Sequence, residues 1–174
     1  GGSASSKVCS RLVGNSVLRV ASSTLPIVAY QFNPLNNVDV FSNDASLLVP
    51  RSAFDAEYYA MTAKTLDRRT GGLFTVPAQN FTGYLAVVAT EDGTQVEVTT
   101  KAGTEQGATQ PALAANSTTM FTLNAFEVLN LEAVANGDLT GSRVRVLGGK
   151  TAGVFAGHQA FARAEDQACC ADHL

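Results

Sequence analysis

Charged residues are scarce in this chain of 174 residues: only 16% are Asp, Glu, Lys or Arg, against about 25% in typical soluble domains. The formal net charge is −3 and the pI is about 5.3. The longest run of basic residues is the pair Arg68-Arg69. Because nucleic acids and anionic membrane surfaces attract proteins through clustered Lys and Arg, we expect neither as a partner.

Long apolar runs and histidines are scarce as well. No window approaches the roughly 18 consecutive apolar residues of a membrane-spanning helix, so we expect no membrane insertion. Histidine occurs only at His158 and His173, and no Gly-x-Ser-x-Gly nucleophile motif is present. Residues 138–141 (DLTG) interrupt the Asp-Thr-Gly pattern of aspartic proteases, and residues 149–151 (GKT) lack the earlier glycine of a phosphate-binding loop. We therefore predict that the domain is not an enzyme.

The residues that are abundant predict one folded domain. The hydrophobic content of 45% is enough for a core, and 174 residues suit a single domain. Residues 1–6 (GGSASS) resemble a linker or a cloning scar, so we assign the domain to residues 7–174. The low charge predicts a surface rich in Ser, Thr, Asn and Gly.

Strand patterns dominate this domain. Ser16–Val20 and Ile27–Phe32 predict a first hairpin, whose sequence shows a weak likeness to that of the last. Three further hairpins are predicted, each around a short turn: Tyr84–Thr90 with Thr94–Thr100, Thr118–Leu123 with Glu127–Glu132, and Ser142–Leu147 with Gly153–Gly157. Ser52–Lys64 suits either helix or strand. We predict an all-β fold, an antiparallel β-sandwich with similar first and last hairpins.

A polar stretch separates two strand patterns between Val28 and Pro50. Its Asn and Asp side chains are of the type that binds calcium, and they are also of the type that forms turns with the local backbone. Only two carboxylates are present and their spacing fits no Asp-x-Asp-x-Asp loop, so an ordered turn is the favoured interpretation and calcium the alternative. The candidate residues are Asn33, Asn36, Asn37, Asp39, Asn43 and Asp44.

The three cysteines are Cys9, Cys169 and Cys170. A disulfide from Cys9 to one of the adjacent pair would join the two ends of the domain, and three reduced thiols are the alternative. Zinc is a further alternative, because the C-terminal region contains residues of the types that ligate it, although their spacing matches no known signature. The candidate zinc ligands are His158, Cys169, Asp172 and His173.

Several short segments resemble, in order, the N-terminal domain of IgGFc-binding proteins. They include VAYQFNPL, VFSNDASLLVP, GYLAVVATEDGTQVEVT, GVFAGH and CCADHL, and the likeness runs from about Ser16 to Leu174. That family includes a secreted mucus protein of animals and many large bacterial surface or secreted proteins, particularly of myxobacteria. The resemblance implies a secreted or cell-surface module with no assigned catalytic residues. The family continues past Asp-His-Leu, so we expect a truncated C-terminus.

This chain also departs from the family pattern. The Cys that often follows the Val-Phe-Gly-Gly strand is missing near Gln159–Phe161, which removes the usual partner of a local disulfide to the C-terminal Cys.

The expected function is therefore non-enzymatic binding or adhesion as one module of a larger protein, with a protein or glycan ligand at a surface. We expect the ligand at the two longest polar loops, Asn33–Ser46 and Thr100–Ser117, because a rigid sandwich displays its loops. A structural spacer domain and a zinc- or calcium-binding module are the alternatives. The oligomeric state is left open.

Overall fold

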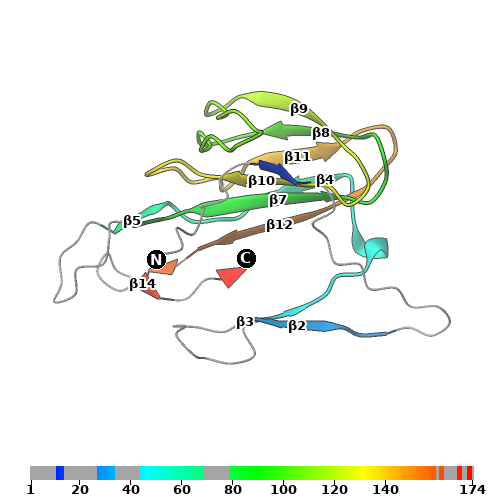
Figure 1. Cartoon of the computed structure of the whole chain (residues 1–174), viewed down its shortest axis with the longest axis horizontal. Coiled ribbons are helices and arrows are strands. Elements are labelled where there is room, and N and C mark those ends of the chain that lie inside the picture. The colour runs from blue at the N-terminus through cyan, green and yellow to red at the C-terminus, as the bar shows by residue number, and fades with distance from the viewer. Residues whose placement is uncertain are drawn as a thin grey trace, which may run out of the picture.

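A computed structural model describes residues 11–13, 27–33, 44–68, 79–159, 161–162, 168–169 and 172–173 (Figure 1). Two antiparallel sheets dominate it, with strand orders β1-β10-β7-β12-β15 and β4-β11-β8-β9. The five-stranded sheet consists of β1 (Arg11–Val13), β10 (Val128–Glu132), β7 (Gly83–Ala89), β12 (Ala152–His158) and β15 (Asp172–His173). The four-stranded sheet consists of β4 (Glu57–Tyr59), β11 (Arg143–Val146), β8 (Thr94–Thr99) and β9 (Thr118–Leu123).

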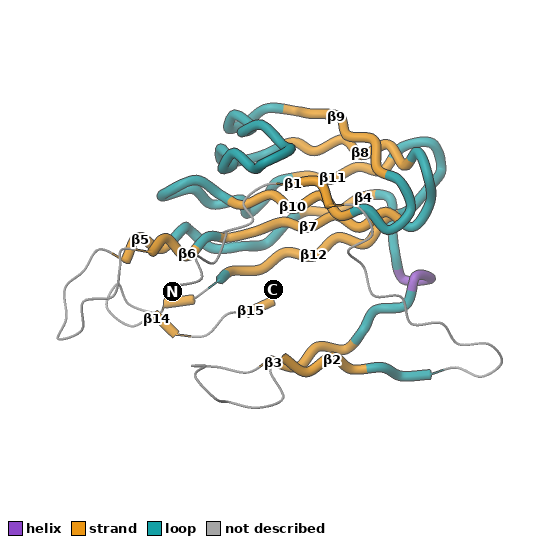
Figure 2. The backbone as a smooth tube through the Cα atoms, in the orientation of Figure 1, coloured by secondary structure: helices purple, strands orange, loops and turns teal. Residues whose placement is uncertain are grey.

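Three two-stranded ladders and one short helical turn complete the described part of the chain (Figure 2). The ladders are β2 (Tyr30–Asn33) with β3 (Asp44–Leu47), β5 (Leu66–Arg68) with β6 (Gln79–Phe81), and β13 (Phe161–Ala162) with β14 (Ala168–Cys169). The 3-10 turn η1 covers Arg51–Ala53. The segment Ser52–Lys64, which suited helix or strand, thus contains the end of η1 and all of β4. The expected all-β sandwich is confirmed.

The core lies between the two sheets because each strand turns alternate residues inward. On β7 the side chains of Leu85 and Val87 are fully buried, whereas Tyr84 and Ala86 on the other face are half-buried. Strand β8 repeats the pattern with Val96 and Val98. Burying each Val or Leu side chain is worth about 1.5–3 kcal/mol, so this alternation favours two sheets packed face to face.

The six strands predicted between Tyr84 and Gly157 are accurate to about a residue, whereas the predicted strand Ile27–Phe32 begins three residues before β2. The three central hairpins predicted from those six strands are wrong. Strands β7 and β8, β9 and β10, and β11 and β12 are consecutive in the chain, yet the members of each pair lie in opposite sheets. Strand β7 instead pairs with β10 and β12, and β8 pairs with β11 and β9. Each turn therefore carries the chain from one sheet across to the other. Because β11 and β12 form no hairpin, the prediction that the first and last hairpins are alike does not hold. Ser16–Val20, the first strand of the predicted first hairpin, lies outside the described residues.

Hydrogen bonds connect the three crossing turns to one another. Asp92 in the first turn accepts the Ala125 amide of the second at Oδ1, at 2.9 Å. The Asp92 carbonyl accepts the Lys150 ammonium of the third turn at 2.5 Å. Gly148 and Gly149 of that third turn both have φ of +73°, which glycine adopts without steric cost. The turns thus stabilise one another at one end of the sandwich. The two strands that each turn joins lie in different sheets.

Candidate binding face

The solvent side of the four-stranded sheet is a regular polar surface. Val144 and Val146 of β11 are buried in the core, so Arg143 and Arg145 point to the opposite side. The same alternation holds in β8, β9 and β4. We call this surface the outer face, and its residues are Glu57, Tyr59, Gln95, Glu97, Thr99, Thr118, Met120, Thr122, Arg143 and Arg145.

The strand register sets these side chains in rows across the sheet. One row runs Tyr59, Arg143, Thr99, Thr118, and the next runs Glu57, Arg145, Glu97, Met120. Neighbouring strands are about 4.8 Å apart, so side chains in a row are within reach of one another.

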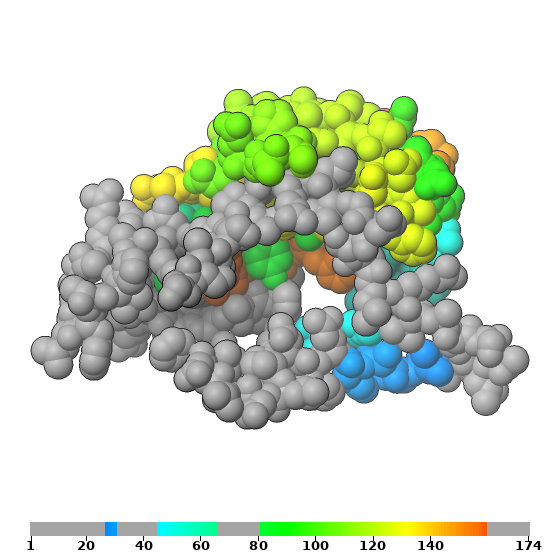
Figure 3. Space-filling view, viewed as in Figure 1, coloured from blue at the N-terminus to red at the C-terminus, as the bar shows by residue number. Residues whose placement is uncertain are grey.

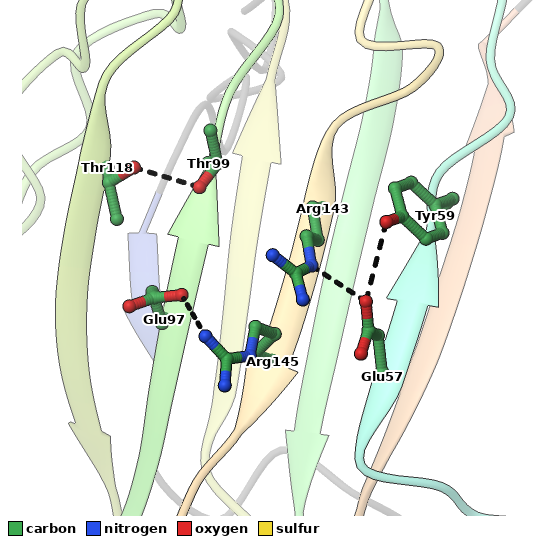
Figure 4. A network of polar contacts seen from close by, with 7 residues as sticks. All are labelled: Glu57, Tyr59, Glu97, Thr99, Thr118, Arg143 and Arg145. Carbon is green, nitrogen blue, oxygen red and sulfur yellow. Dashed lines mark hydrogen bonds and ion pairs between the residues drawn. The ribbon is translucent and has the colours of Figure 1, made fainter.

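Hydrogen bonds and ion pairs connect most of these residues (Figure 4). Arg143 Nε donates to Glu57 Oε1 at 2.7 Å, and the Tyr59 hydroxyl reaches the same oxygen at 3.4 Å. Arg145 Nη1 donates to Glu97 Oε1 at 3.3 Å. At the other side of the sheet, the hydroxyls of Thr99 and Thr118 share a hydrogen bond of 2.9 Å.

The ion pair between Glu57 and Arg143 holds both groups in their charged forms. The hydrogen bond from Arg143 lowers the pKa of the Glu57 carboxyl below its ordinary value. The same hydrogen bond raises the pKa of the Arg143 guanidinium. With Arg145 and Glu97 added, the centre of the outer face carries two positive and two negative groups and is electrically balanced.

Large apolar side chains lie at both sides of this charged centre. Tyr59 on β4 is 67% exposed and Met120 on β9 is 49% exposed. Tyr, Met and Arg are enriched in protein–protein interfaces relative to the rest of protein surfaces. An exposed sheet surface that combines these residue types is suited to contact with another protein.

Comparison with known proteins identifies the family. A family model described as IgGFc binding protein matches residues 44–174, which include every strand of the four-stranded sheet. The chain belongs to the IgGFc-binding protein family. No curated protein and no solved structure matches it. Among the residues that the structure describes, no helix is long and apolar enough to cross a membrane.

In this IgGFc-binding family member, the predicted polar loop joins two paired strands. Asn33 ends β2 and Asp44 begins β3, and the two residues are opposite each other in the ladder. Asn36, Asn37, Asp39 and Asn43 lie outside the described residues, so the calcium alternative stays a prediction. Within the described ranges, no group of three or more His, Cys, Asp or Glu side chains is placed to hold a metal ion.

The predicted zinc ligands lie on two different ladders. His158 on β12 is opposite Asp172 on β15, and His173 is opposite Gly157, so three of the four ligands are on adjacent strands. Cys169 lies on β14, opposite Phe161. The His158 ring is 1% exposed, and its Nε2 lies 3.2 Å from the Lys64 carbonyl oxygen. The side chains of Cys169, Asp172 and His173 are not described, and neither are Cys9 and Cys170, so zinc and the disulfide stay predictions.

The second predicted binding loop, Thr100–Ser117, is held against the sandwich. The Thr104 amide donates to the Leu113 carbonyl at 3.0 Å, and the Leu113 amide donates to Thr104 Oγ1 at 3.0 Å. Both residues are buried, and the Glu105 amide donates to the Glu132 carbonyl of β10 at 2.9 Å. Thr104, Glu105 and Leu113 therefore fix part of this loop to the sandwich, while other residues of the loop are exposed.

Sequence reasoning missed the outer face. The signal was the strict alternation in residues 143–146 (RVRV) and 95–98 (QVEV), whose polar members share one side of a strand. What was lacking was the identity of the neighbouring strands.

Proposed function

We propose that this domain is a non-enzymatic module that binds a protein partner outside the cell, and that the partner docks on the outer face. Membership of the IgGFc-binding protein family supports a protein ligand and an extracellular location. The single observation that carries the choice of surface is the array of Tyr59, Met120 and two arginines on one exposed sheet face.

The ion pairs prepare this face for binding. An arginine that is already held across the sheet loses less side-chain entropy when a partner docks than an arginine that moves freely. Arg143 and Arg145 are both held in this way, by Glu57 and Glu97. Balanced charge also favours a partner surface of mixed polarity over a strongly charged one.

The size of the face indicates how much of an interface it supplies. The ten residues of the outer face cover an area on the order of 300 Å², from the usual strand spacing and rise. A standard interface buries about 800 Å² per partner, so we expect adjoining segments to contribute the remainder.

Binding of a purified partner to surface-immobilised domain tests the proposal. The probes are purified IgG Fc, which the family description names, and an array of secreted and cell-surface proteins. We expect Tyr59→Ala to weaken binding of the responding protein by at least about ten-fold, as for a truncated aromatic hot spot. Tyr30→Ala is the matched control, because Tyr30 on β2 is similarly exposed, at 61% against 67% for Tyr59.

Two results would contradict the choice of surface. One is unchanged affinity of Tyr59→Ala and of Arg143→Ala. The other is a loss of binding confined to Asn33→Ala and Asp44→Ala, which would assign the ligand to the polar loop. Binding to glycans alone would contradict a protein partner, and failure of all probes would favour the spacer alternative.

A further inference from the structure

Strand β9 forms one edge of the four-stranded sheet. In the described part of the chain it pairs with β8 alone, along all six residues from Thr118 to Leu123. The strand lies at the top of the molecule in Figure 1, and yellow-green atoms of this region form the corresponding surface in Figure 3. Thr118, Met120 and Thr122 all have exposed side chains.

The hydrogen-bond pattern of β8 shows which backbone groups of β9 point outward. The Thr100 amide donates to the Ser117 carbonyl on the β9 side, at 2.9 Å. Because the direction of backbone groups alternates along an antiparallel ladder, Thr119, Phe121 and Leu123 bond toward β8. The amides and carbonyls of Thr118, Met120 and Thr122 then point away from the sheet, and none of the described residues supplies a backbone partner for them.

Natural sheets protect such edges with charge, proline, bulges or short strands. The opposite edge, β4, follows this rule, since it has only three residues, includes Glu57, and is anchored by a bridge from Asp55 to Ala152. Strand β9 (TTMFTL) has none of these features: it is twice as long and contains no charged residue, proline or glycine. Its sequence is therefore compatible with a further strand at this edge.

We propose that β9 pairs antiparallel with β9 of a second copy of this chain, so that two four-stranded sheets become one continuous sheet of eight strands. In the register that uses every outward backbone group, Met120 lies opposite Met120 of the second copy and Thr118 lies opposite Thr122. This arrangement forms about six backbone hydrogen bonds.

A second copy of the chain suits this edge because strand β9 is uncharged. In this antiparallel pair Met120 meets its own copy at the two-fold axis, so a charge at position 120 would meet a like charge. The nearest charge on the outer face is Glu97 on β8, opposite Met120. The two copies of Glu97 would be separated by three strand spacings, about 14 Å, which exceeds the Debye length of about 8 Å at physiological salt. Their repulsion is therefore largely screened.

The dimer does not rest on the proposed function, because its backbone hydrogen bonds use the edge of the sheet, although the Met120 side chain belongs to the outer face as well. It would nevertheless place both outer faces on the same side of the joined sheet, since the two-fold axis of such a strand pair is perpendicular to the sheet.

Sedimentation velocity of the whole chain, over a range of concentrations and without ligand, tests the dimer. We expect a monomer–dimer equilibrium, and we expect Met120→Lys to raise its Kd at least ten-fold by placing two ammonium groups opposite each other. Met61→Lys is the matched control, since the chain has only these two methionines and both are exposed, Met61 at 56% and Met120 at 49%. It should leave the Kd unchanged.

A second variant tests the register and does not depend on loss of association. Under oxidation, Met120→Cys should form a bridge between the two introduced thiols, identified as a cross-linked peptide by mass spectrometry, because opposite residues in such a pair have Cα atoms about 5.5 Å apart. Met61→Cys should not. A chain that stays monomeric at every concentration would overturn the proposal. So would a dimer equally affected by both lysine variants, or a monomer that binds foreign extended peptides along β9.

Discussion

Arg143 and Val144 are adjacent on β11, but they belong to opposite faces of the four-stranded sheet. Val144 is fully buried against the other sheet, whereas Arg143 lies on the outer face and pairs with Glu57. The same contrast separates Val98 from Glu97 on β8 and Leu123 from Thr122 on β9. One set of strands thus provides a core on one side and a polar, exposed array on the other.

This difference shows that stability and the proposed binding can be changed separately in one sheet. Apolar burial stabilises the inner face, while exposed ion pairs contribute little to folding. Residues of the outer face are therefore open to substitution with little loss of fold, as a binding surface requires.

The largest expected effect comes from truncation of the inner face. Leu123 on β9 is fully buried, so Leu123→Ala should lower the free energy of unfolding by about 2–5 kcal/mol through lost burial and a residual cavity. Its neighbour Thr122 points outward, and Thr122→Ala should change stability by less than about 0.5 kcal/mol. Urea unfolding followed by circular dichroism measures both, and equal losses would mean that the two faces do not differ as described.

A smaller decrease in the free energy of unfolding is expected when the buried hydroxyl of Thr62, close to β4 in the chain, is removed. Thr62 is 7% exposed, donates to Asp138 Oδ1 at 2.9 Å and accepts the Leu139 amide at 3.1 Å. Thr62→Val leaves that amide without its acceptor and should cost about 1–3 kcal/mol. Thr99→Val removes an exposed hydroxyl pair on the outer face and is the control, expected to be near neutral in the same unfolding experiment. A neutral Thr62→Val would contradict this role.

The smallest expected effect is a loss of folding stability at acidic pH. Partial burial would raise the pKa of Asp138, but hydrogen bonds from Thr140 and Thr62 outweigh it and hold that pKa below the ordinary 3.8. The carboxylate therefore stabilises the fold above its unfolded pKa, and this contribution is lost as pH falls through the lower folded pKa. Asp138→Asn should be less stable than the wild type at neutral pH, and the two should converge in acid.

Glu57→Gln provides the comparison from the outer face. The pKa of Glu57 is lowered too, so its effect has the same sign, but the exposed ion pair should also weaken with added salt. Thermal melts at neutral pH and below pH 3.8 check both variants. A stability difference for Asp138→Asn that does not change with pH would contradict the assigned cause.

The sequence by itself determined where strands β7 to β12 lie and which faces of those strands are buried. Thr118–Leu123 was predicted to the residue, and Tyr84–Thr90 is displaced by one residue from β7. Alternation of Val with polar residues was sufficient to predict these strands and their buried faces, because side chains in a strand point to opposite faces in turn wherever the strand is placed. The all-β sandwich follows from the same pattern.

Only the tertiary structure decided which strands are neighbours, and with that the candidate face and the unpaired edge. Glu91-Asp92-Gly93 suits a hairpin and an inter-sheet crossing equally well, since both need a tight turn between two half-buried strands. Contacts of that turn with Asn124-Ala125 and Lys150, distant in sequence, accompany the crossing. Arg143 and Glu57 are 86 residues apart. Backbone hydrogen-bonding groups are the same in every strand, so the choice of partner depends on packing of the whole sandwich.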